Sequence, residues 1–146
     1  MDFSYSGTQL SIIEAITDVV SGFDDDYWYE CDDKAKFPND FYMELAKGGW
    51  LGIAMPKLYG GSGLGITEAA LMMQKISESG GGMTAASAVH INIFGPHPIV
   101  VHGTESKKAE WLPPLVSGKM RCCFGVTEPD AGLDTGSLST FARRDG

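Results

Sequence analysis

Cysteine is scarce in this chain of 146 residues, which contains only Cys31, Cys122 and Cys123. No two of them form a C-x-x-C pair, and adjacent cysteines in a strand point to opposite faces of the sheet. This pattern argues against a zinc site and against a disulfide framework. We therefore expect no bound metal and a reducing compartment.

Long apolar runs and an excess of positive charge are missing as well. No apolar run reaches the roughly 18 residues of a transmembrane helix. The early run "LSIIEAITDVV" contains Glu14 and Asp18 and lacks the basic leader of a signal peptide. The formal net charge of -8 argues against a general affinity for nucleic acid or anionic membranes. We expect a soluble protein with neither kind of partner.

The remaining composition is that of an ordinary globular domain, with 43% apolar residues and a length that suits one compact core. Apolar residues recur three or four positions apart in several segments, and Ser6 and Gln9 have the spacing of a capping box before the first. Glycine and proline mark the ends of these segments, and Pro113 and Pro114 are expected to break the last one. The pattern predicts helices near residues 7–22, 38–48, 68–79, 83–94 and 105–112.

Two other stretches are predicted to be irregular. The stretch "DDDYWYECDDK" combines an acidic run with aromatic residues, but it lacks the glycine and glutamate that an EF-hand loop needs. We interpret it as a solvated acidic connection whose aromatic side chains are partly tucked inward. The stretch "WLGIAMP" is predicted to be a short extended segment that ends at Pro56.

The periodicity of the sequence changes near residue 120. There "RCCFGVT" is predicted to be a strand, "EPDAGLDTG" a loop and "SLSTFARRDG" a second strand. Two strands alone do not make a stable sheet in water. The pair therefore either packs on the helices or belongs to a domain whose remainder is missing.

Three motifs in order, "GWLGIAMPKLYGGSGLG", "HGTESKKAEWLPPLVSGK" and "FGVTEPDAGLD", resemble the amino-terminal part of an acyl-CoA dehydrogenase, over about residues 37–146. The resemblance implies a mainly α fold, an orthogonal or up-down bundle of about five to six helices over residues 1–120. A β-hairpin over residues 121–146 would begin a truncated β-barrel domain. The parent would be an FAD enzyme, a homo-oligomer (dimer or tetramer) when full length, in the cytoplasm or in the mitochondrial matrix of a eukaryote.

The resemblance also implies which residues bind FAD, because the T-E-P-x-A-G loop of the family runs along the isoalloxazine ring and on to the pyrophosphate. Thr127 can donate and accept hydrogen bonds, and a glycine at 132 lets backbone N–H groups approach phosphate closely. Leu133 stands where the family commonly has serine, so it would contact cofactor or substrate only through its backbone. The residues assigned to FAD are Phe124 beside the ring, Val126 and Thr127 at its polar edge, and Gly132 and Leu133 at the pyrophosphate. Without the resemblance, "TEPDAG" would be a simple tight turn.

Ser87, His90 and Phe94 fall at i, i+3 and i+7, on one face of an apolar helix. Similar positions in the family line the channel for the acyl chain, so these three, with the backbone of Leu133, are assigned to the substrate. Ordinary core packing with one satisfied histidine is the alternative. Acyl-CoA is the implied substrate, and an electron-transfer flavoprotein is the implied acceptor.

No catalytic residue is predicted in this chain. Glu128, Asp130 and Asp134 lie in a turn, where solvation or backbone capping is favoured over a catalytic role. In the family a glutamate of the carboxy-terminal helical domain removes the α proton, so we expect this fragment to be inactive by itself. Two alternatives stay open: a flavin-dependent oxidase or monooxygenase of the same superfamily, and a non-catalytic helical interaction module.

Overall fold

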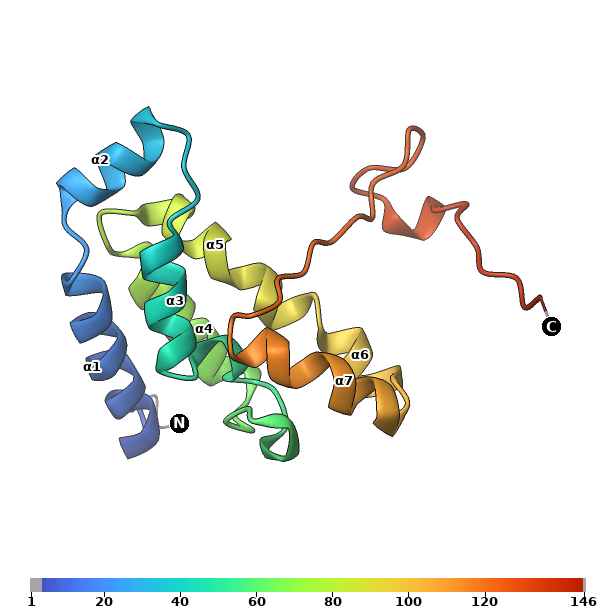
Figure 1. Cartoon of the computed structure of the whole chain (residues 1–146), viewed down its shortest axis with the longest axis horizontal. Helices are drawn as coiled ribbons and strands as arrows, with labels where there is room; N and C mark the ends of the chain where they lie inside the picture. Colours follow the sequence, from blue (N-terminus) through green and yellow to red (C-terminus); the bar gives the residue numbers. More distant parts are fainter. Residues whose placement is uncertain (1–3, 146) are drawn as a thin grey trace.

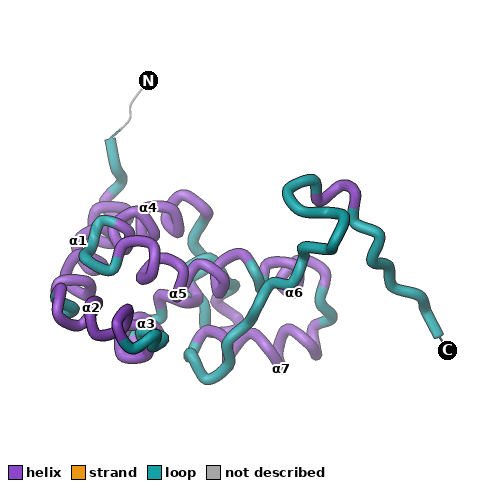
Figure 2. The backbone as a smooth tube through the Cα atoms, turned by 90° about the horizontal axis from the view of Figure 1, so that it is seen from above, coloured by secondary structure: helices purple, strands orange, loops and turns teal. Residues whose placement is uncertain are grey.

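The computed structural model describes residues 4–145 and is mainly helical, as Figures 1 and 2 show. No part of that range forms a β-strand, and none of its helices is long and apolar enough to cross a membrane. The α-helices are α1 (Gly7–Ser21), α2 (Asp25–Asp33), α3 (Asn39–Lys47), α4 (Ile66–Ser77), α5 (Gly82–Phe94), α6 (His97–His102) and α7 (Glu105–Val116). Three short 3-10 helices cover Trp50–Gly52, Lys57–Tyr59 and Thr135–Ser137.

Side-chain caps explain where several helices begin. The Ser6 hydroxyl accepts the Gln9 N–H and the Gln9 side chain accepts the Ser6 N–H, which is the predicted capping box. Asp24 accepts the Tyr27 N–H at the start of α2, and Thr104 accepts the Lys107 N–H at the start of α7. Each cap satisfies a backbone donor that has no partner inside its helix.

The core lies between α1, α3, α4 and α5, which stand side by side in Figure 1. Ile16, Leu45 and Ile76 are fully buried there. Helix α5 packs in the middle through Ala85 and Val89, as its nearly uniform apolar sequence predicted. A second cluster joins α7 to the 3-10 helices through Met55, Tyr59, Leu112, Leu115 and Val116.

The acidic stretch before residue 34 is a helix, α2, and not the predicted connection. Its cap explains the difference, and so does one buried face that carries Trp28 and Cys31. The Trp28 ring lies 5.1 Å from that of Phe41 in the core. The predicted inward orientation of the aromatic residues therefore holds for Trp28 and for the half-buried Tyr27, while Tyr29 is exposed.

Two further local predictions were wrong. The residues Trp50–Gly52 form a 3-10 helix instead of an extended segment. Pro113 and Pro114 lie inside α7 and do not end it. Proline lacks the N–H but keeps its carbonyl, and these two carbonyls accept the N–H groups of Ser117 and Met120.

The predicted β-hairpin is not formed in the part of the chain that the structure describes. Residues 121–145 instead form a tail that leaves the helical body (Figure 1), with a single bridge between Glu128 and Ala131 closing a turn. Two strands without a further sheet to pair with are too weakly held to persist. The Glu128 carboxylate, moreover, occupies the N–H groups of Ser139 and Thr140 that a strand partner would need.

Candidate site at the end of helix α5

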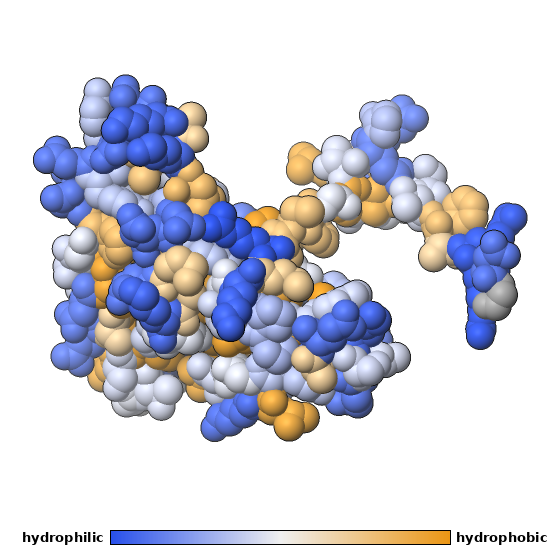
Figure 3. Space-filling model, in the orientation of Figure 1, coloured by the Kyte–Doolittle hydropathy of each residue, from blue (hydrophilic) through white to orange (hydrophobic). Residues whose placement is uncertain are grey.

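An apolar cavity of about 570 Å³ lies where the tail crosses the end of α5. Its walls are formed by residues from three segments: Leu64, just before α4, with Ile66 at the start of α4; Ile93 and Phe94 of α5; and Phe124 of the tail. Figure 3 shows hydrophobic residues where the tail joins the helical body. The cavity suits an apolar ligand group, because its lining is almost entirely aliphatic and aromatic.

Aromatic contacts bring three of the predicted site residues together. The Phe94 and Phe124 ring centroids are 5.1 Å apart at an interplanar angle of 81°, an edge-to-face pair. The His90 ring lies 5.2 Å from that of Phe94, and its Nδ1 is 3.2 Å from the Ser87 carbonyl oxygen. The predicted acyl face and the predicted cofactor segment therefore meet at Phe94.

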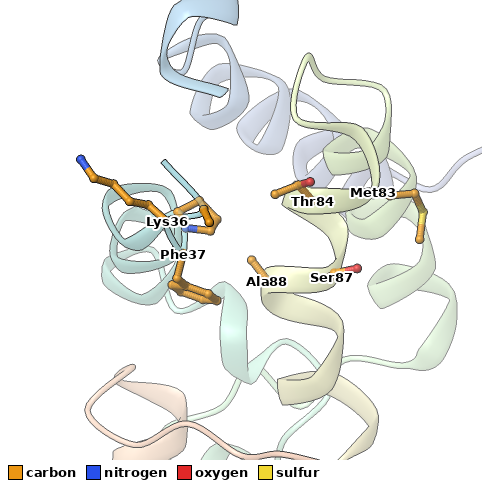
Figure 4. Close-up of a pocket in the computed structure, with 8 residues that line it drawn as sticks. Lys36, Phe37, Met83, Thr84, Ser87 and Ala88 are labelled. Atoms are coloured by element: carbon orange, nitrogen blue, oxygen red, sulfur yellow. The ribbon is translucent and has the colours of Figure 1, made fainter. Parts of the chain in front are cut away.

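A second cavity, of about 580 Å³, lies toward the other end of α5 (Figure 4). Phe37 comes from the connection between α2 and α3, and Ala88 faces it from α5. Met83, Thr84 and Ser87 complete the α5 side. Ser87 thus belongs to this cavity and Phe94 to the first, with His90 between them along the helix.

The remaining predicted cofactor residues lie in the tail and line neither cavity. Val126 is half-buried, whereas Thr127, Gly132 and Leu133 are exposed. No backbone group of residues 123–127 is hydrogen-bonded to another part of the described chain. A Cβ added at Gly132 would meet nothing within 4 Å, so its backbone is open to approach.

Two of the three loop carboxylates, Glu128 and Asp134, cap the backbone, which is one of the two roles that the sequence favoured. Hydrogen bonds donated by Thr140 and Ser139 lower the pKa of Glu128 to about 2. Asp134 accepts the Gly136 N–H at 3.2 Å and the Ser137 hydroxyl at 2.7 Å. A carboxylate with so low a pKa is a poor proton acceptor near neutral pH. Within residues 4–145 there is also no group of three or more His, Cys, Asp or Glu that could hold a metal ion.

Two residues that the sequence did not single out stand beside this site. Asn92 is the one fully buried polar residue between positions 4 and 145 and lies two residues before Phe94. Arg121 lies three residues before Phe124, where the tail begins, with its guanidinium carbon 4.1 Å from the Phe37 ring centroid. A lone amide in an otherwise apolar helix was a signal for Asn92, whereas no local pattern pointed to Arg121.

Residues 6–119 match the family model described as "Acyl-CoA dehydrogenase, N-terminal domain". The chain therefore belongs to the acyl-CoA dehydrogenase family, through the domain that this model represents. The resemblance found in the three sequence motifs is confirmed.

Among curated relatives, acyl-CoA dehydrogenase FadE12 of Mycobacterium tuberculosis is 31% identical over 99% of this chain and 37% of its own length. Bovine mitochondrial isovaleryl-CoA dehydrogenase is 37% identical over 80% of this chain and 28% of its own length. The 3-(aryl)acrylate reductase of Clostridium sporogenes is 34% identical over 80% of this chain and 31% of its own. The matched part thus spans between 28% and 37% of the length of these three relatives.

Solved structures show the same fold. A chain of the structure that describes the electron transferring flavoprotein of Acidaminococcus fermentans superposes with a TM-score of 0.82 and 27% identity, over 94% of this chain and 36% of that one. A chain of the ChsE4-ChsE5 complex from Mycobacterium tuberculosis gives a TM-score of 0.77 at 24% identity, over 100% of this chain and 37% of that one. The second likeness bears on the fold alone.

Proposed function

We propose that this chain is the amino-terminal part of an FAD-dependent acyl-CoA dehydrogenase. The complete enzyme converts an acyl-CoA to the trans-2-enoyl-CoA and passes the electrons to an electron-transfer flavoprotein. In this proposal residues 1–120 are the helical domain, and residues 121–146 begin a middle β domain. Membership of the family supports the reaction, since the matched relatives include enzymes named for it.

The residues at the start of the tail fit a flavin. Phe124 offers an aromatic face beside the apolar cavity, and the unpaired backbone of residues 123–127 offers donors and acceptors for the polar edge of a ring. The Thr127 hydroxyl adds one more, while Gly132 and Leu133 would meet the pyrophosphate through open backbone. A flavin bound there would supply the acceptor for the hydride that leaves the β carbon.

One observation carries the proposal: the edge-to-face contact between Phe94 and Phe124, at 5.1 Å. It makes a single wall out of the helix proposed to hold the acyl group and the segment proposed to hold the flavin. Ser87, seven residues before Phe94 on the same helix, lines the cavity of Figure 4. An acyl chain lying along α5 would therefore begin beside the flavin and end near Ser87.

The proton acceptor is assigned to a glutamate outside this chain, from the carboxy-terminal helical domain of the family. Glu128 is held as a weak base by its hydrogen bonds, and Asp134 caps the backbone. We accordingly expect the isolated chain to lack dehydrogenase activity, and the full-length enzyme to be a dimer or tetramer.

The test uses the full-length enzyme that contains this chain. Purified with FAD and kept without oxygen, it should bleach its flavin when acyl-CoA is added, and should release little hydrogen peroxide in air. Peroxide in proportion to substrate would instead indicate an oxidase, and no flavin at all, with a co-purifying protein, would indicate an interaction module. Phe124→Ala should weaken FAD binding, with Phe141→Ala as an exposed aromatic control outside the cavity.

The relatives also give a specific reason to assay the opposite direction. Two of them are named 3-(aryl)acrylate reductase and acryloyl-CoA reductase (NADH). Reduction of an enoyl substrate by the pre-reduced flavin, with no oxidation of the saturated acyl-CoA, would replace the dehydrogenase proposal by a reductase.

A further inference from the structure

The buried amide of Asn92 connects α5 to three other parts of the chain. Its Nδ2 donates to the Tyr42 hydroxyl of α3 at 3.0 Å and to the Leu115 carbonyl of α7 at 3.3 Å. Its Oδ1 faces the Cys122 thiol of the tail, with a sulfur–oxygen distance of 3.7 Å. Burying an amide is costly unless its polar atoms are paired, and here all of them have partners.

The Cys122 thiol completes this connection from the tail. Its single S–H hydrogen is shared between the Asn92 Oδ1 and the Ile91 carbonyl oxygen, which lies 3.4 Å from the sulfur. Burial raises the pKa of this thiol, which keeps it a donor. The glycine at 95 leaves room for the sulfur, because a Cβ there would lie 3.2 Å from it. Two residues later the extended tail places Phe124 against Phe94.

Arg121, the residue before Cys122, contacts Phe37 and the first residue of α3. Its guanidinium carbon lies 4.1 Å from the Phe37 centroid and 4.9 Å from the Tyr42 centroid, and the group donates to the Asn39 side-chain oxygen. Tyr42 is thus bonded to Asn92 through its hydroxyl and faced by Arg121 on its ring. Both contacts act on the same side chain of α3.

Beyond these contacts the tail interacts with itself. The hydrogen bonds of residues 128–140 in the described structure join members of that segment only. The direction of the tail is consequently fixed where it leaves the helices, by residues 121–124.

We propose that Asn92 and Arg121 are positioning residues that hold Phe124, and the segment up to Thr127, against the end of α5. The role in flavin binding rests on the proposed function, but the positioning itself is a property of this chain without cofactor. It can therefore be tested whether or not the chain binds FAD.

The test is NMR spectroscopy of the labelled chain, free of flavin. In the unaltered protein we expect cross-peaks between the Phe94 and Phe124 rings and restrained amides at residues 122–126. Arg121→Gln removes the cation, and Asn92→Leu removes the amide at similar volume. Each should abolish the ring cross-peaks and lower the heteronuclear NOE of those amides, while the core signals of α1 and α4 persist.

Matched variants make the result specific. Lys119→Gln removes a nearby exposed positive charge and should change nothing. Arg121→Lys keeps a cation over the rings without the planar donor group, and should retain part of the cross-peak intensity. If Asn92→Leu does not fold, Arg121→Gln still tests whether the start of the tail is held against α5.

Unchanged ring cross-peaks in a folded Arg121→Gln variant, or an equal loss in Lys119→Gln, would overturn the proposal. A failure of FAD to bind the unaltered full-length enzyme would count against the proposed function and leave this result intact.

Discussion

Single side chains set the start of the first helix. The Ser6 hydroxyl accepts the Gln9 N–H at 3.2 Å, and the Gln9 side-chain oxygen accepts the Ser6 N–H at 3.0 Å. Ser6→Ala should lower the free energy of unfolding by about 1 kcal/mol, because it leaves a backbone donor without its cap. Urea unfolding followed by circular dichroism measures this, with Thr8→Ala as the neighbouring control. Alanine has a higher helix propensity than threonine, so Thr8→Ala should lose no stability, and an equal loss in both variants would contradict the capping role.

Glu128 gives the tail a dependence on pH. Its pKa is lowered to about 2 by hydrogen bonds from Thr140 and Ser139, so its stabilising effect is complete above the ordinary carboxyl pKa and is lost as the pH falls toward 2. The amide signals of Ser139 and Thr140 should move in that acid range. In Glu128→Gln these amide signals should already be displaced at neutral pH, and they should not shift further in the acid range. A midpoint near the ordinary glutamate pKa would contradict the hydrogen-bonded geometry.

Residue-level prediction from sequence succeeded where the partners are close along the chain. The Ser6–Gln9 box spans three residues and follows from a short motif. Arg121 contacts Asn39 across 82 positions, and Asn92 contacts Tyr42 across 50. Such pairings depend on how the helices pack, and spacing in the sequence carries no record of that.

At the scale of elements, the packing of α2 depends on the close approach of the turn at Gly81 to the Trp28 ring. A Cβ at Gly81 would lie within 2.6 Å of the Trp28 ring, which is itself packed in the core. Gly81→Ala should therefore cost about 1–3 kcal/mol of unfolding free energy, since the indole must move. Gly7→Ala is the control, because nothing lies within 4 Å of its added Cβ and alanine favours a helix.

The same unfolding experiment decides that prediction. A Gly81→Ala variant as stable as Gly7→Ala would mean that the ring of Trp28 can shift without loss of packing. Indole fluorescence of the two variants would then report whether Trp28 has become exposed.

Most helices were predictable because their apolar residues repeat with the helical period. Helix α1 was predicted at 7–22 and is found at Gly7–Ser21; the one predicted at 83–94 is found at Gly82–Phe94. Helix α2 was missed because its acidic composition hides a short buried face. The hairpin was wrongly predicted because strand periodicity alone does not supply the neighbouring strands that a sheet needs.

For the whole molecule, the helical body should be independent of the far part of the tail. The hydrogen bonds of residues 128–140 are internal to that segment of the described chain. A chain ended after Thr127 should therefore keep the unfolding free energy of the full chain within about 0.5 kcal/mol, as an exposed change does. Differential scanning calorimetry measures it, and a clearly larger loss would show that the tail supports the helices.

The candidate site was predictable only in part, and mainly through the family resemblance. Helical spacing placed Ser87, His90 and Phe94 on one face, but it did not show that Ser87 lines one cavity and Phe94 another. The contact between Phe94 and Phe124 joins residues far apart in sequence. Its cause lies in the packing of α3, α5 and α7 around Asn92, which is a property of the folded chain.

The projecting tail is attached to the helical body only at one end of the described segment, through residues 121–124. A small change of angle at residues 121–124 becomes a larger displacement at the turn around Gly132, because within residues 4–145 no backbone hydrogen bond joins that turn to the helices. Any substitution that loosens the contacts of residues 121–124 would thus be felt most at the point farthest from them. The position of the Gly132 turn is therefore set by the contacts at the start of the tail, which involve the Phe94 ring, the Asn92 amide and the Arg121 guanidinium group.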